Sequence, residues 1–173
     1  MNLYEGLITR RSIRKYRTEP VSYEIIEGLI RAGMYAPSAV NCQPWHFVVI
    51  DDKHIMQQIM EVHAYASMLK NAQAAILVCG DEHLQHSEGY WAVDCAAATQ
   101  NILLAAHDKG LGAVWLGLHP REERKSAIQT IFDLPGHIQP FSIISIGWPD
   151  EEKETPDRFK PERIHYNNWE NNG

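Results

Sequence analysis

The stretch from Ser87 to Lys109 constrains the fold more than any other, because its apolar residues recur with the period of one long helix. At a rise of about 1.5 Å per residue it would span roughly 30–35 Å, the width of a small domain. Gly110 follows it and is well suited to end a helix. The apolar and small side chains fall on two adjoining faces, with Trp91, Cys95, Ala98, Ile102 and Ala105 on one and Ala92, Ala96, Thr99, Leu103 and Ala106 on the other. We therefore predict a central helix whose apolar surface is wide enough to be shared with a partner subunit.

Four shorter apolar segments are typical of β-strands, and helical patterns lie between them. The predicted strands are residues 45–50, 74–79, 112–118 and 138–146. The other predicted helices are residues 3–9, a segment capped by Ser22 that carries Ile25, Ile26, Leu29 and Ile30, residues 53–62, and a segment with Pro120 at its first position that runs to about Ile131. Because the strands are too far apart in the sequence for simple hairpins, this order predicts an α+β layered fold.

The chain is short enough to form a single domain over residues 1–173. From residue 149 onward the sequence has many charges and few aliphatic residues, so we expect residues 149–173 to form an extended tail that docks elsewhere. The N-terminus has no signal-peptide pattern and no apolar run approaches the roughly 20 residues of a membrane span, so we expect a cytoplasmic protein without a membrane partner. A net charge of −6 argues against a nucleic-acid partner.

Basic residues are concentrated in one short segment of this acidic chain. Five of the 16 Lys and Arg residues fall within eight positions, namely Arg10, Arg11, Arg14, Lys15 and Arg17. Guanidinium groups bind planar oxyanions through paired N–H donors, and the hydroxyl of Ser12 adds a further contact. A small phosphate-bearing ligand fits this segment better than a polymer does. The alternative from these residues alone is a basic turn that is simply solvated.

The familiar catalytic motifs are missing from the chain. The segment Gly110-Leu111-Gly112 lacks the third glycine of a dinucleotide-binding loop, because Trp115 occupies that position. There is also no Walker A lysine loop, no H-E-x-x-H and no G-x-S-x-G. The sequence thus combines an oxyanion-binding segment with no acid–base pair and no nucleophile, which indicates that a bound cofactor carries the chemistry.

Two other polar features have structural interpretations. His83 and His86 could lie on one side of a turn close to Asp81 and Glu82, as metal ligands do. No third ligand in helical register accompanies them, so we interpret the segment as an exposed polar loop and predict no metal site. Asp94, on the largely apolar long helix, is interpreted as a buried hydrogen-bonding residue rather than a catalytic one.

Three motifs, in their order and spacing, resemble the FMN-dependent nitroreductase superfamily. They are Arg10-Arg11-Ser12-Ile13-Arg14, then Ala36-Pro37-Ser38 with Asn41-x-Gln43-Pro44-Trp45, and then Gly110-Leu111-Gly112 before a predicted strand. The resemblance extends from Tyr4 to the tail. It implies a nitroreductase-like α+β fold with a mixed or antiparallel central sheet, a long central helix, and a C-terminal tail that wraps the partner subunit of a homodimer.

The resemblance also implies which residues bind FMN. The phosphate and ribityl chain would be held by Arg10, Arg11, Ser12 and Arg14. The flavin would be reached from the other subunit by Pro37, Ser38, Ala39 and Asn41. The isoalloxazine would lie along Trp115, Leu116 and Gly117, with the backbone N–H of Gly117 near flavin N5. The tail would return Lys160 and Arg163 to the phosphate, and no catalytic side chain is implied.

The sequence departs from the family pattern in two places. The region between the second predicted strand and the long helix is brief, whereas larger relatives carry inserted helices there that help to cover the substrate. Many members also have Glu where Gly117 falls, so only a backbone role is expected at that position. The pattern assigns no partner for the pyrimidine edge of the flavin, although Asn71 and Gln73 lie near the relevant place in the sequence.

The activity implied by the resemblance has two half-reactions. NADH or NADPH would deliver a hydride to FMN N5, and a nitroaromatic or quinone would then take its place on the same flavin face. A reductive dehalogenase or a flavin-destroying enzyme of the same fold is an alternative, as is a regulatory protein that binds FMN without turnover. Reduced ferredoxin is the alternative electron donor.

Overall fold

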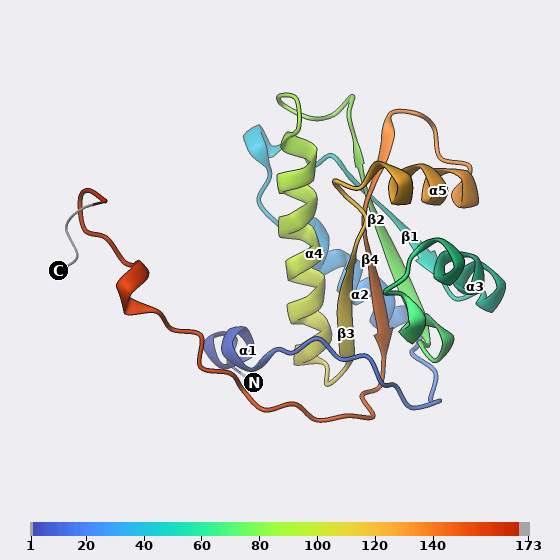
Figure 1. Cartoon of the computed structure of the whole chain (residues 1–173), viewed down its shortest axis with the longest axis horizontal. Coiled ribbons are helices and arrows are strands. Elements are labelled where there is room, and N and C mark those ends of the chain that lie inside the picture. The colour runs from blue at the N-terminus through green and yellow to red at the C-terminus, as the bar shows by residue number, and fades with distance from the viewer. Residues whose placement is uncertain (1, 170–173) are drawn as a thin grey trace.

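The computed structural model describes residues 2–169 as a layered α+β domain followed by a projecting tail (Figure 1). The α-helices are α1 Leu3–Thr9, α2 Tyr23–Met34, α3 Lys53–Val62, α4 Tyr90–Asp108 and α5 Glu122–Phe132. The strands are β1 Trp45–Ile50, β2 Ala74–Asp81, β3 Gly112–Gly117 and β4 Ile138–Gly147. Three short 3₁₀ turns complete the described elements, η1 Ala39–Asn41, η2 Ser67–Lys70 and η3 Pro161–Arg163. The α+β prediction is therefore confirmed.

The four strands form one sheet in the order β1-β2-β4-β3, and each of the three pairings is antiparallel. Every residue of β2 is buried, as expected of a strand with neighbours on both sides and layers over both faces. β3 lies at an edge of the sheet, where Ser12 makes a single parallel bridge to Ala113. The N-terminal basic segment therefore runs along the outer side of β3.

Two apolar clusters cover the two faces of the sheet. One packs α2 and α4 against it and includes Leu29, Ile76, Trp91, Ala98, Ile102 and Ile144. The other packs α3, η2 and α5 against the opposite face and includes Met56, Ile59, Leu69, Leu77, Ile128 and Ile143. Alternate residues of each strand enter opposite clusters, which is the period-2 alternation of a sheet buried on both sides.

Helix α4 is the central helix that the sequence predicts, although it begins later than expected. Gly89 adopts φ 83° immediately before it, so the helix starts at Tyr90 rather than Ser87. Gly110 adopts φ 74° just beyond its end, which confirms the predicted stop. Thr99 is fully buried and donates a hydrogen bond to the Cys95 carbonyl at 2.8 Å, so the polar group does not interrupt the packing.

The prediction that Pro120 is the first residue of a helix is wrong. The peptide between His119 and Pro120 is cis, and α5 begins at Glu122 with Arg121 as its N-cap residue. The Arg121 N–H donates to the Leu118 carbonyl at 2.9 Å and closes a turn ahead of the helix. Pro120 therefore lies in that turn, between the end of β3 and α5.

The tail leaves the domain after β4. Pro149 bridges to Tyr16, and the Asp150 N–H donates to the Lys15 carbonyl at 2.9 Å, so the first part of the tail runs beside the N-terminal segment. Farther on, the described tail extends away from the domain and exposes Phe159, Tyr166 and Trp169 (Figure 1). Within the described residues, no helix combines the length and apolar character needed to cross a membrane.

Candidate functional site

The basic segment Arg10–Arg14 is held in place by β3. The Ile13 N–H donates to the Ala113 carbonyl at 3.0 Å, which extends the edge of the sheet by one bridge. Gly112 allows this close approach, because a Cβ at that position would lie 2.6 Å from Ile13 Cγ2. The backbone of the segment is therefore fixed while its side chains remain available.

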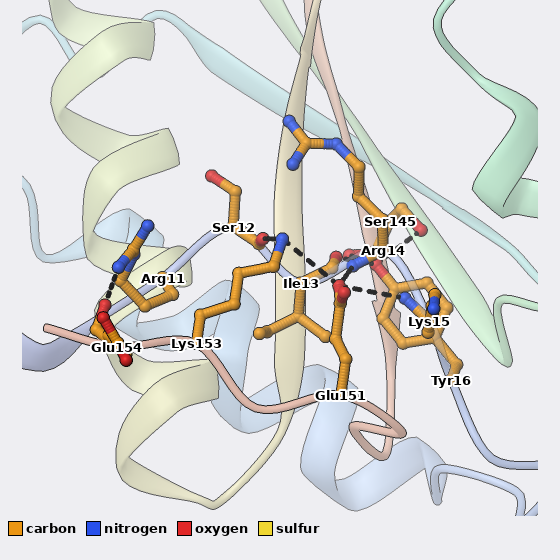
Figure 2. A network of polar contacts seen from close by, with 10 residues as sticks. All are labelled: Arg11, Ser12, Ile13, Arg14, Lys15, Tyr16, Ser145, Glu151, Lys153 and Glu154. Carbon is orange, nitrogen blue, oxygen red and sulfur yellow. Dashed lines mark hydrogen bonds and ion pairs between the residues drawn. The ribbon is translucent and has the colours of Figure 1, made fainter.

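Acidic and basic residues of the tail hold the other side of the same segment (Figure 2). Glu151 Oε1 accepts hydrogen bonds from the N–H groups of Arg14 at 2.6 Å and Lys15 at 3.3 Å. Lys153 Nζ donates to the Ser12 carbonyl at 2.7 Å and lies 3.3 Å from Glu151 Oε1. Burial tends to raise the pKa of Glu151, but the Arg14 N–H and Lys153 outweigh it, so the net pKa is lower than usual. The contacts of Glu151 and Lys153 use backbone groups of the segment and do not engage its arginine side chains.

The guanidiniums of the segment have no carboxylate partner among the described residues. The ion pairs within residues 2–169 do not include Arg10, Arg11 or Arg14. Arg11 donates to the Glu154 carbonyl, which is neutral. Partial burial lowers the pKa of Arg10, and the positive charges of Arg158 and Arg11 lower it further. Arg10, Arg11 and Arg158 thus lie close enough to repel one another, and an anion bound among them would relieve that repulsion.

A cavity of about 390 Å³ opens beside the end of β3. Its lining comes from the basic segment, the turn after α3, the end of β3 and α5, namely Arg14, His63, Ala64, Tyr65, Ser67, Met68, Trp115, Leu116, Gly117 and Arg124. Figure 2 shows the Arg14 guanidinium pointing away from Glu151 and the tail. The cavity thus combines two guanidiniums with aromatic and apolar walls.

The backbone of Gly117 is held by two side chains from distant segments. Its carbonyl accepts hydrogen bonds from Arg124 at 3.1 Å and from His63 Nε2 at 3.1 Å. Alternate residues of an edge strand turn their backbone groups away from the paired strand, and Ala113 already does so toward Ile13. Gly117, four residues farther along β3, has the same orientation, so its N–H also faces the open edge.

His63 is neutral, and its contacts define its tautomer. Burial lowers the pKa of His63, and its side chain lies almost wholly out of solvent. The Tyr65 N–H donates to Nδ1 at 3.2 Å, so Nδ1 carries no proton and Nε2–H is the donor to Gly117. Arg124 also lies over the Tyr65 ring, 5.6 Å from its centroid. The Gly117 peptide is therefore pre-organised by His63 and Arg124, which are themselves both in contact with Tyr65.

The loop that contains Pro37, Ser38, Ala39 and Asn41 lies elsewhere in the chain, beside the N-terminal half of α4 (Figure 1). None of these four residues lines the cavity at Gly117. Val40 adopts φ 51° and Asn41 adopts φ 58°. A positive φ is unusual for a β-branched residue such as Val40. Asp94 Oδ1 accepts from the Ala39 N–H at 3.0 Å, which agrees with its predicted hydrogen-bonding role.

The structure brings together only part of the predicted site. Arg14, Trp115, Leu116 and Gly117 line one cavity. Arg10, Arg11 and Ser12 are not among its lining residues, and Arg11 lines a second cavity between the N-terminal segment and the tail. Lys160 and Arg163 are exposed on the tail. The cavity at Gly117 is not lined by Asn71 or Gln73, and the Gln73 side chain instead donates to the carbonyls of Arg17 and Asn71.

Six residues that line the cavity are not predicted from the sequence, namely His63, Ala64, Tyr65, Ser67, Met68 and Arg124. No motif joins them, because His63 follows α3 whereas Arg124 lies within α5. The available signal is a general one. Polar and aromatic residues that directly follow a helix or begin the helix after a site strand are candidates for the site wall.

The comparison with known proteins agrees with the fold and the motifs. The model of the nitroreductase family matches residues 7–91 and 57–148. The chain belongs to the nitroreductase family. A relative from Methanothermobacter thermautotrophicus, provisionally named NADH dehydrogenase/NAD(P)H nitroreductase, is 47% identical over 169 residues, covering 98% of this chain and 88% of the relative.

Solved structures of family members have the same fold. A protein from Parabacteroides distasonis with the same provisional name superposes with a TM-score of 0.92 at 40% identity, over 96% of this chain and 98% of that one. A nitroreductase-like protein from Desulfovibrio desulfuricans, described in complex with FMN, has a TM-score of 0.84 at 30% identity, over 98% of this chain and 99% of that one. The nitroreductase fold of this chain is thus shared along almost its full length.

Proposed function

We propose that this chain is a homodimeric, FMN-dependent oxidoreductase. It takes a hydride from NADH or NADPH and passes electrons to a small oxidant such as a nitroaromatic or a quinone. The observation that carries the proposal is the cavity at Gly117, where an outward-facing backbone N–H lies beside Arg14 and Arg124, neither of which has a carboxylate partner in residues 2–169.

The donor set of the N-terminal segment fits the phosphate of FMN. Arg10, Arg11 and Arg14 have no carboxylate partner in residues 2–169, so binding an anion breaks no existing ion pair. The Ser12 hydroxyl points to the side away from the tail (Figure 2). Charge-assisted hydrogen bonds to a phosphate are the strongest that such groups make. In this proposal the segment supplies most of the binding free energy.

The aromatic and apolar walls of the cavity and its two guanidiniums suit a flavin ring. FMN, when bound, would supply the redox chemistry. The Gly117 N–H would donate to the ring at N5, and His63 and Arg124 hold that peptide in one orientation. Arg14 and Arg124 line this cavity, and their positive charges would stabilise negative charge on a bound, reduced ring electrostatically. No general acid is required among the side chains.

A homodimer explains the parts of the predicted site that one chain leaves apart. Large apolar side chains are exposed on α1, α2 and the start of α4, among them Leu3, Tyr4, Leu7, Ile8, Met34 and Val93. A groove of about 450 Å³ lies between α1, the end of α2 and the C-terminal half of α4. A second copy packed there would cover this surface. The Pro37–Asn41 loop of each chain would then reach the flavin of the other, as would Lys160 and Arg163 of its tail.

Flavin binding tests the proposal directly. The purified full chain is mixed with FMN, dialysed, and its visible absorption recorded before and after addition of NADH or NADPH without oxygen. We expect about one FMN per chain, bleaching by a nicotinamide, and recovery of the colour with a nitroaromatic or quinone. Failure to retain FMN contradicts the proposal at its first step. Retained FMN that neither nicotinamide reduces would favour a regulatory protein or another electron donor.

A further inference from the structure

A second cluster of ligand-type side chains lies away from the cavity at Gly117. Asp81 ends β2, His83 follows in the next turn, and His137 immediately precedes β4. One ligand atom from each of the three residues lies within 4.8 Å of the others. The two imidazole rings stack with centroids 4.2 Å apart. The sequence pattern pairs His83 with His86, whereas the fold pairs His83 with a residue far along the chain.

The backbone that carries these side chains is fixed. Asp81 is in register with Ile138 at the last step of the β2–β4 ladder. The Glu82 N–H donates to the His137 carbonyl at 3.0 Å, which ties the two turns to each other. The Asp81 N–H donates to the Pro44 carbonyl at 2.7 Å. A ligand that joined the three side chains would therefore require side-chain rotation only.

The Asp81 carboxylate lacks a strong partner for one of its oxygens. Asp81 is 9% exposed, and Oδ1 accepts the His83 N–H at 2.8 Å. Oδ2 lies 3.7 Å from His46 Nε2, which is too long for a hydrogen bond. A carboxylate that is mostly removed from water is stabilised by a cation that reaches it. His46 would be a third nitrogen ligand and the fourth ligand overall.

We infer that Asp81, His83 and His137 form a binding site for a divalent cation of the zinc type, with His46 or water at the fourth position. Imidazole and carboxylate ligands are the set that zinc accepts, at about 2.0–2.2 Å. Neighbouring ligands around such an ion lie about 3.3–3.5 Å apart, so the exposed His83 ring must turn out of its stack on His137. The ion would tie the end of β2 to the start of β4. Its ligands do not line the cavity at Gly117.

Zinc titration of the untagged full chain tests the inference. The protein is first stripped with a chelator, and zinc is then titrated in competition with a chromophoric zinc indicator. We expect one zinc per chain with a dissociation constant at or below about 10 µM. His137→Gln and His83→Gln should each weaken binding by about tenfold or more, because each removes a direct ligand. Zinc should raise the melting temperature of the unaltered chain and not of His137→Gln.

His86→Gln is the matched control, because His86 lies on the same loop but outside the cluster and packs edge-on against Tyr90 with ring centroids 6.3 Å apart. It should leave zinc affinity unchanged. Zinc binding weaker than about 100 µM, or an equal loss in His86→Gln and His137→Gln, overturns the inference. Circular dichroism of each variant without zinc shows whether it is folded. His83 is exposed, so His83→Gln keeps the test valid even if His137→Gln unfolds.

Discussion

The basic segment Arg10–Arg14 and the Gly117 end of β3 meet at one cavity, but they are built in opposite ways. The segment gathers its cations locally, and the tail fixes it through backbone contacts from Glu151 and Lys153. The Gly117 peptide is instead held by side chains from two remote segments, the neutral His63 and the cationic Arg124. The part of a binding site whose charges are neighbours in the sequence can thus be predicted from the sequence. The part whose geometry depends on residues that meet only in the folded chain cannot.

The largest effect is expected from the residue that belongs to both regions. Arg14→Ala should weaken FMN binding by about 2–4 kcal/mol, because it removes charge-assisted hydrogen bonds to a partly buried anion. The backbone N–H of residue 14 keeps its bond to Glu151 in this variant, so the fold should survive. Flavin fluorescence quenching measures the dissociation constant. Arg17→Ala, which removes a surface pair with Glu19, is the control and should bind FMN normally. Equal affinity in the two variants would contradict the role of Arg14.

The close contact between the basic segment and β3 predicts the next effect. Gly112→Ala would place a methyl group 2.6 Å from Ile13 Cγ2, so either the segment or the strand must shift. We expect a loss of about 1–3 kcal/mol in the free energy of unfolding, which is typical of overpacking. Urea unfolding measures it. If the free energy of unfolding equals that of the unaltered chain, the basic segment moves aside without cost. In that case β3 does not fix the segment.

The third effect sharpens the contrast at the Gly117 end. Arg124→Ala removes a donor to the Gly117 carbonyl and one of the two guanidiniums of the cavity. We expect FMN to bind roughly tenfold more weakly, about 1.4 kcal/mol, since one charge-assisted contact and the orientation of one peptide are lost. Arg121→Ala is the control, because Arg121 is exposed and lies outside the cavity. If both variants bind FMN alike, Arg124 has no part in the site.

The fold was predictable where local signals decide it. Gly110 and Ser22 flank helices as their residue types suggest, and the four strands follow from short apolar runs. Boundaries failed where the backbone conformation of one residue decides them. Gly89 takes a left-handed conformation and delays α4, and the turn closed by Arg121 keeps Pro120 out of α5.

The site was predictable to the extent that its residues are neighbours in the sequence. Arg10 to Arg14 carry the anion signal by themselves, and the resemblance to a family places Gly117 on the site strand. His63 and Arg124 could not be found in this way, because they meet only after the turn behind α3 and the start of α5 pack beside β3. The hydrogen bond that Asp94 accepts from the Ala39 N–H could not be predicted either, because tertiary packing brings the two residues together.

A smaller effect concerns the pH dependence of stability. Burial lowers the pKa of His63 in the folded chain, so the unfolded chain binds a proton more readily. The free energy of unfolding should therefore fall as the pH drops below about 6.5, the ordinary value for histidine. His63→Gln should make this decline shallower. It should not abolish the decline, because burial also lowers the pKa of His107 and of His119 in the folded chain. Urea unfolding at several pH values between 5 and 8 measures it. An unchanged slope would mean that His63 binds a proton equally readily in the folded and the unfolded chain.

The smallest effect is expected at Gly117 itself, and it separates a backbone role from a side-chain one. A Cβ at Gly117 would meet no atom within 4 Å, so Gly117→Ala should change the free energy of unfolding by less than about 0.5 kcal/mol. The N–H is retained, and FMN affinity should stay within about twofold, a difference of about 0.4 kcal/mol. Calorimetric titration with FMN measures this. A large loss of affinity would show that the ring needs the space over the Gly117 Cα. The glycine would then be selected for shape, and the hydrogen bonds from His63 and Arg124 would serve to hold that surface in place.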